Sequence, residues 1–180
     1  MNWSSASAAG IVLFLPAQIM KSISQKLLTL GHTLPPAPQP VANFAATARI
    51  GDLLYVSGQI GFIENRANHT GRLGATLNVA QGYAAAQAAA LNVIAHIAEA
   101  TGDALGGLKR IVKVGVFVAS TPDFEQHPTV ANGASDLFVS VFGDAAKHAR
   151  AAVGVAALPL GAAVEVEAIV QLSTEFSQHI

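Results

Sequence analysis

The chain has 180 residues, the length of one ordinary domain with a core of its own. Hydrophobic residues make up 52% of it and charged residues only 12%, far fewer than a solvent-coated monomer usually carries. The formal net charge is −1, and the ten lysines and arginines form no block. This balance argues against a nucleic-acid-binding protein, and we expect other subunits to cover part of the surface. An alanine-rich core is the alternative explanation of the high hydrophobic fraction.

Cysteine is absent from the sequence, which excludes disulfides, cysteine nucleophiles and thiolate metal sites. This fits a reducing compartment, and we expect a cytoplasmic protein. Residues 8–17 form an apolar run that is too short to span a bilayer, and no Lys or Arg precedes it as one would in a secretory signal. We therefore interpret residues 1–19 as an N-terminal extension and expect no contact with a membrane.

Residues 20–40 are predicted to be a lead-in to the domain body. A serine at position 22 or 24 begins a short leucine-bearing helix, and four prolines follow soon after it. So many prolines exclude both a helix and a central strand, and we interpret them as an extended linker. The domain body then covers residues 41–175.

The domain body alternates strands with helices. The expected elements are strands over 44–50 and 53–57, a helix over 78–100, a strand over 109–119, a helix over 128–142 and strands over 150–158 and 163–171. A glycine-punctuated loop is expected over residues 60–75. The order β-β-α-β-α-β-β predicts a single α+β domain, in which two helices cover one face of a mixed sheet.

The sequence contains no motif for a metal or a cofactor. Its six histidines are scattered, with no pair at the helical i, i+4 spacing and no HExxH motif. The clustered glycines at positions 102, 106 and 107 follow a helix rather than a strand, which argues against a phosphate-binding loop. No GxSxG motif is present for a serine nucleophile. We therefore expect neither metal nor cofactor.

Arg150 is the residue that points most directly to a ligand. It opens a strand of small residues, where a guanidinium is costly unless it is paired or faces a cleft. Its planar fork fits a carboxylate bidentately, and Glu165, which we expect on a neighbouring strand, is placed to orient a water as acid or base. The alternative is that Arg150 simply pairs with Glu165, Glu167 or Asp144. The residues alone favour that alternative.

Four motifs, in order and in register over about residues 40–172, resemble those of the Rid family (YjgF, reactive intermediate deaminases). The first, LLYVSGQI from Leu53, resembles the family's hydrophobic-Ser-Gly-Gln-hydrophobic strand end. Asp123-Phe124, followed by the run from Asn132, resembles its second helix. The segment HARAAVGVAALP from His148 is similar to its Pro-Ala-Arg-x-x-Val-x-Val-x-x-Leu-Pro signature. Finally, VEVEA from Val164 resembles its closing strand.

The resemblance implies a chorismate-mutase-like α+β fold, a homotrimer with ligand pockets between subunits, and chemistry without a cofactor. It also implies hydrolysis of reactive 2-imino acids, or their enamine tautomers, to 2-keto acids and ammonia. Arg150 would hold the substrate carboxylate, and Glu165 would position the attacking water. The pocket residues that match by position are Phe44, Ser57, Gly58, Asn132 and Ala152, the last through its backbone N–H.

Three positions depart from the family pattern. Phe44 stands where the family usually has tyrosine, His148 where it has proline, and Ala152 where it often has cysteine. The lost tyrosine hydroxyl bears on substrate range and rate. Two other functions stay open: a non-catalytic trimer that binds a small carboxylate metabolite, and an endoribonuclease or translation inhibitor, a label often attached to this family. The weak basic character of the chain argues against the last of these.

Overall fold

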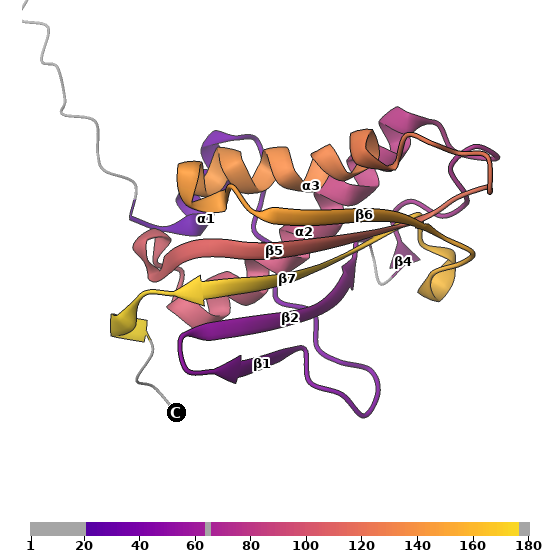
Figure 1. Ribbon diagram of the computed structural model, residues 1–180. Helices are drawn as coiled ribbons and strands as arrows, with labels where there is room; N and C mark the ends of the chain where they lie inside the picture. Colours follow the sequence, from indigo (N-terminus) through magenta and orange to yellow (C-terminus); the bar gives the residue numbers. More distant parts are fainter. Residues whose placement is uncertain (1–20, 64–65, 177–180) are drawn as a thin grey trace, which may run out of the picture.

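A five-stranded mixed sheet is the framework of the domain (Figure 1). The computed structural model describes residues 21–63 and 66–176, so the expected extension over residues 1–19 lies outside the described part. The strands stand in the order β1-β2-β7-β5-β6, and only β5 and β6 run parallel. Their bounds are β1 Thr47–Ile50, β2 Leu53–Ile60, β5 Leu108–Ala119, β6 Ala149–Val155 and β7 Val164–Leu172.

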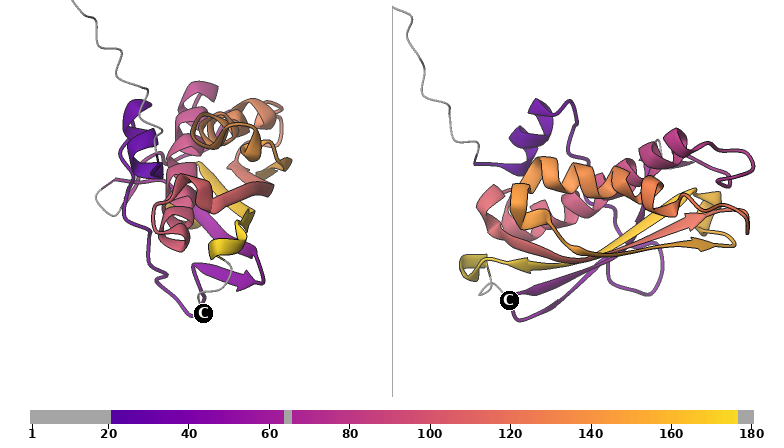
Figure 2. Two further views of the ribbon diagram at one scale, coloured as in Figure 1. Left: turned by 90° about the vertical axis from the view of Figure 1, so that its left-hand side faces the viewer. Right: turned by 45° about the horizontal axis from the view of Figure 1, so that its top comes forward.

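Two long helices, α2 (Val79–Thr101) and α3 (His127–Phe142), cover one face of the sheet (Figure 2). In the described part of the chain, the opposite face carries no helix. This arrangement confirms the predicted α+β class and the order β-β-α-β-α-β-β. The short lead-in helix that was expected is present as α1 (Ile23–Thr29), and Ser22 caps it. The structure also adds a two-strand hairpin, β3 (Phe62–Ile63) and β4 (Arg66–Ala67), inside the stretch predicted to be a loop.

The ends of both long helices follow local sequence signals. Asn78 and Gln81 form a capping box at the start of α2, each side chain accepting from the other's backbone N–H at 2.9 Å. Gly102 ends α2 with a φ of 58°, a left-handed conformation that glycine adopts at low cost. The third helix begins at His127 with Pro128 in its first turn.

The core lies between the helices and the sheet. Alternation along β7 turns one set of side chains toward the helices and the other set, including Glu165 and Glu167, toward the uncovered face. The set that is buried against the helices is Val164, Val166, Ala168, Val170 and Leu172. The two helices also pack tightly on each other, because Gly133 of α3 lies directly against the backbone carbonyl of Tyr83. No helix among the described residues is both long enough and apolar enough to cross a membrane.

Candidate active site

Four of the predicted site residues meet in one cleft. Phe44, Ser57, Gly58 and Glu165 all line a hollow of about 460 Å³ at the end of β2 and the start of β7. Its other walls are mostly apolar, and they include Pro38, Pro40, Val41, Ile60, Phe62 and Leu160. A small organic molecule with an apolar body fits a site of this kind, with Glu165 as the acidic group in its wall.

A β-bulge brings the backbone of β2 up to Glu165. The pairing of β2 with β7 changes register between Val56 and Gln59, and this places Ser57 and Gly58 in the bulge. Gly58 lies so close to Glu165 that a Cβ at this position would collide with the carboxylate. The Ser-Gly-Gln motif of the sequence therefore forms the bulge, and its glycine leaves the space that the Glu165 carboxylate occupies.

Ser57 holds the cleft wall that carries Phe44. Its hydroxyl donates to the carbonyl of Ala45 at 2.8 Å, and its backbone N–H donates to the carbonyl of Ala46 at 3.0 Å. The ladder between β1 and β2 ends at the pair of Thr47 and Val56, next to the bulge, so the strand predicted from residue 44 begins only at Thr47. The Phe44 ring stays 52% exposed at the rim of the cleft. The hydroxyl of Ser57 thus fixes backbone, and its hydrogen is already engaged.

The carboxyl group of Glu165 is half-buried, and burial raises its pKa above the usual range; the neighbouring carboxylate of Glu167 raises the pKa further. Neither carboxylate forms an ion pair with any side chain that the structure describes, a set that leaves out the side chain of Arg66. A carboxyl group with a raised pKa exchanges protons more readily near neutral pH, which is the property required of an acid–base group.

Arg150 lies in a second cluster, where α3 packs over the edge strand β6. Its Nη1 donates to Asn132 Oδ1 at 2.9 Å and to Ser135 Oγ at 3.0 Å, while its Nη2 donates to the carbonyl of Pro128 at 3.4 Å. All three acceptors are neutral, so they orient the guanidinium without cancelling its charge. Ala152 lies on the same side of β6, because Ala152 and Arg150 are two residues apart on the strand.

These bonds leave one edge of the guanidinium available. They engage both Nη1 hydrogens and one Nη2 hydrogen. Among the residues whose side chains the structure describes, the Nε–H and the other Nη2 hydrogen have no partner, and Arg150 is exposed. Two parallel donors on one edge are the arrangement that binds a carboxylate bidentately. Arg150 therefore keeps donors of the kind that bind a carboxylate.

The structure contradicts the alternative in which Arg150 pairs with Glu165, Glu167 or Asp144. Among the described residues, Asp144 pairs instead with Lys147 at 2.7 Å, and no carboxylate pairs with Arg150. The charge of Arg150 is therefore not compensated by any of these three carboxylates.

The expectation that Arg150 and Glu165 occupy neighbouring strands is wrong, because β5 lies between β6 and β7. In β5, Val114 is opposite Arg150 and Phe117 is opposite Glu165. Residues three apart in a strand point to opposite faces of the sheet. One chain therefore presents two separate groups of predicted site residues, the Arg150 cluster toward the helices and the Glu165 cleft on the uncovered face.

Sequence reasoning missed two members of the Arg150 cluster, Ser135 and His148. Ser135 Oγ lies 3.1 Å from His148 Nε2, and the sequence marks His148 only as a departure from the family pattern. The signal for Ser135 was present, because Asn132 and Ser135 are three residues apart on a helix and therefore share one face. No described group of three or more His, Asp or Glu side chains is arranged to hold a metal ion.

Comparison with known proteins identifies the family of this fold. The model of the family described as "YjgF/chorismate mutase-like, putative endoribonuclease" matches residues 24–172. The chain belongs to the YjgF family. As a YjgF protein it is 49% identical over 152 residues to Protein TCP17 of Trypanosoma cruzi, covering 84% of this chain and 94% of that one.

Two further relatives are informative. A 2-iminobutanoate/2-iminopropanoate deaminase of Dermatophagoides farinae is 34% identical over 137 residues, covering 76% of this YjgF chain and 91% of the relative. The crystal structure of Atu1372, a protein of unknown function from Agrobacterium tumefaciens, is 41% identical and superposes with a TM-score of 0.79. That match covers 84% of this chain and 92% of the other. The chain thus spans nearly the full length of these relatives.

Proposed function

We propose that this YjgF protein hydrolyses reactive 2-imino acids, or their enamine tautomers, to 2-keto acids and ammonia. The observation that carries the proposal is the guanidinium of Arg150, which three neutral acceptors hold in place with one bidentate edge free. A 2-imino acid offers the carboxylate that such an edge binds. The 34% identity to a protein named as an iminobutanoate/iminopropanoate deaminase supports the same chemistry.

The reaction asks little of the protein beyond orientation and proton transfer. The iminium carbon is already electrophilic, so a water held beside it forms the new C–O bond once a base removes a proton. Glu165, whose pKa burial raises, accepts that proton and returns it to the nitrogen. The C–N bond of the protonated carbinolamine then breaks while Glu165 takes the hydroxyl proton, which releases ammonia and leaves the 2-keto acid.

In our proposal the two groups are half-sites that combine between subunits of a homotrimer, one subunit supplying Arg150 and its neighbour supplying Glu165. Support comes from the apolar side chains exposed beside the Glu165 cleft, since contiguous apolar surface marks an interface. They are Val41 at 98% exposure, Leu160 at 68%, Phe44 at 52% and Phe62 at 42%. A trimer in which each subunit contributes two different patches closes as a ring.

The test uses an imine generated in place from 2-aminobutyrate by an amino-acid oxidase, with semicarbazide as the trap for unreacted imine. We expect wild-type protein to accelerate 2-ketobutyrate release and Arg150→Ala to slow it by about 100-fold or more, because the bidentate contact is lost. Arg150→Lys keeps the charge without the planar fork and is expected to recover only part of the rate. Equal rates for wild type and Arg150→Ala would overturn the proposal.

The Glu165→Gln variant distinguishes an enzyme from a protein that only binds a carboxylate. Since Gln cannot take a proton from water, we expect this variant to bind 2-ketobutyrate in calorimetry while losing about 100-fold or more of the hydrolytic rate. If wild type and Glu165→Gln instead bind the acid equally and neither accelerates hydrolysis, the protein is a carboxylate-binding module and not an enzyme.

A further inference from the structure

A chain of hydrogen bonds continues behind Arg150 into the protein. Ser135 Oγ, which accepts from Arg150 Nη1 at 3.0 Å, lies 3.1 Å from His148 Nε2. The other ring nitrogen of His148, Nδ1, lies 2.6 Å from the carbonyl of Ala146. The buried ring of Phe138 meets the imidazole edge to face, with ring centroids 6.0 Å apart. His148 is thus fixed on three sides.

The donor and acceptor of each hydrogen bond in this series follow from its last acceptor, the carbonyl of Ala146. A carbonyl only accepts, so the hydrogen of His148 must lie on Nδ1. Burial lowers the pKa of His148, the Ala146 hydrogen bond opposes this, and the nearby charge of Arg150 lowers the pKa again. In the neutral ring Nε2 is an acceptor, so the hydroxyl of Ser135 donates to it. This turns the oxygen lone pairs of Ser135 toward Arg150.

We propose that His148 is a positioning residue for carboxylate capture, acting through Ser135 to fix the orientation of the Arg150 guanidinium. The inference rests on the proposed function, because it assigns a role in binding the same carboxylate. Without His148, the Ser135 hydroxyl rotates and its oxygen is an acceptor for Arg150 only part of the time. With His148 present, Arg150 Nη1 donates steadily to Asn132 and Ser135, and the edge formed by Nε and Nη2 is left for the ligand.

The place of His148 in the fold also suits this role. His148 lies two residues before Arg150 on the same edge of the sheet, and alternation turns both side chains toward α3. Ser135 lies between them on that helix. A residue without an acceptor near the place of Nε2 at position 148 would leave the Ser135 hydroxyl without its partner. The imidazole is therefore the feature that converts a helix serine into a fixed acceptor for the guanidinium.

The first measurement is NMR of the full-length protein labelled with ¹⁵N in histidine and arginine. We expect His148 Nε2 to show the shift of an unprotonated ring nitrogen at neutral pH, and Arg150 to show separate, slowly exchanging Nη signals. His148→Ala and Ser135→Ala should merge the Arg150 Nη signals. His148→Gln, which carries an uncharged acceptor near the place of Nε2, should restore them. His32→Gln, a histidine change in the lead-in, is the matched control.

The second measurement is calorimetry with 2-ketobutyrate. His148→Ala and Ser135→Ala should weaken binding about 10-fold, as expected for loss of one hydrogen bond to a charged group. His148→Gln should stay within about threefold of wild type. Tight binding by His148→Ala, with separate Arg150 Nη signals, would overturn the role of His148. If wild type binds no 2-ketobutyrate and hydrolyses no imine, the proposed function fails, and the NMR signals then decide the role of His148 alone.

Discussion

Gly58 lies in direct contact with the carboxylate of Glu165, so the bulge in β2 and the acidic group of the cleft form one unit. No side chain fits between the two. The bulge also holds Ser57, whose hydroxyl fixes Ala45 and with it the wall that carries Phe44. The Ser-Gly-Gln motif therefore shapes the site through backbone position rather than through a reacting side chain.

The first prediction concerns Gly58→Ala. The new Cβ occupies the place of the Glu165 carboxylate and must displace it. We expect the hydrolytic rate to fall by about 100-fold, because the acid–base group leaves its position. The control is Gly106→Ala, where a Cβ meets nothing within 4 Å and the rate should match wild type. A wild-type rate in Gly58→Ala would show that the carboxylate is not required where the structure places it.

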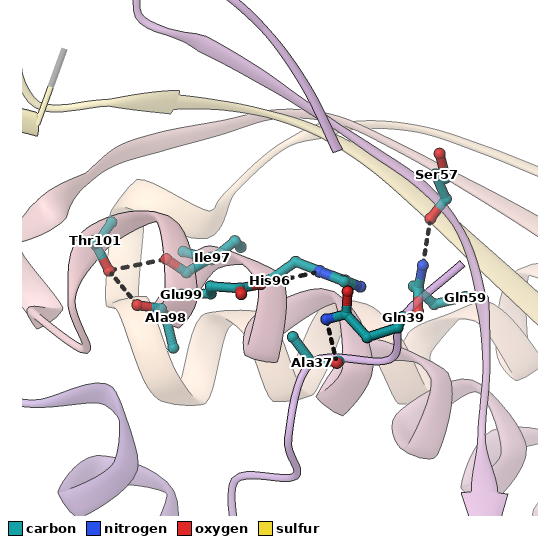
Figure 3. A network of polar contacts seen from close by, with 9 residues as sticks. All are labelled: Ala37, Gln39, Ser57, Gln59, His96, Ile97, Ala98, Glu99 and Thr101. Atoms are coloured by element: carbon teal, nitrogen blue, oxygen red, sulfur yellow. Dashed lines mark hydrogen bonds and ion pairs between the residues drawn. The ribbon is translucent and has the colours of Figure 1, made fainter. Parts of the chain in front are cut away.

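The second prediction concerns the pH dependence of stability. His96 is only 2% exposed, burial lowers its pKa, and its nearest charge is Glu99 of the same helix at 3.8 Å (Figure 3). A histidine with a lowered folded-state pKa contributes stability that is fully present above its unfolded-state pKa of about 6.5. That stability is lost as the pH falls from there through the folded-state pKa.

We therefore expect the free energy of unfolding of His96→Leu to fall less than that of wild type between about pH 8 and about pH 5. Urea unfolding followed by circular dichroism measures the difference. Other titrating groups are common to both proteins, so the comparison isolates His96. Parallel pH curves for the two proteins would contradict burial as the cause.

Much of the fold could be predicted from the sequence because it depends on local periodicity. Alternation along β7 separates its valines from Glu165 and Glu167, and the structure has the same separation. The isolated charge of Arg150 on a strand of small residues predicts a binding group, and this stays a prediction. Its partners in the described chain are not acidic, and it retains a free bidentate edge.

The relation between Arg150 and Glu165 could not be obtained from periodicity, because it depends on which strands are neighbours. The two strands that carry them are consecutive in the sequence, yet β6 pairs with β5 through the α3 crossover, and β7 takes the other side of β5. A strand-helix-strand unit favours this parallel pairing, so the information was present in the element order. The bulge at Gly58 was not predictable, since it depends on the register between β2 and β7.

The third prediction concerns Gly133→Ala, for which helix propensity and packing have opposite effects on stability. Gly133 lies in the interior of α3, where alanine is intrinsically better by about 1 kcal/mol. However, a Cβ there would collide with the backbone carbonyl of Tyr83, which cannot rotate away as a side chain would. We expect Gly133→Ala to lower the free energy of unfolding by about 2–3 kcal/mol, the cost of overpacking. Urea unfolding provides the value, and an increase in stability would mean that α2 and α3 can separate cheaply.

The last prediction tests whether one active site is built from two chains. Arg150→Ala and Glu165→Gln each damage one half-site of every subunit, so each variant alone should be inactive. When the two are co-expressed, some interfaces join the intact Arg150 cluster of one subunit to the intact Glu165 cleft of another. If subunits mix at random in equal amounts, about one interface in four is fully intact, and about a quarter of the wild-type activity should return.

The control is the double variant Arg150→Ala, Glu165→Gln co-expressed with wild type. It also gives about a quarter of intact interfaces when mixing is random, and it therefore calibrates the measured recovery. Mixing the separately purified single variants without subunit exchange should restore nothing. If co-expressed single variants stay inactive while this control retains about half of the activity, the fraction expected when each wild-type chain carries a whole site, the two half-sites do not meet between subunits. The uncovered sheet face and the Arg150 cluster would then serve separate purposes.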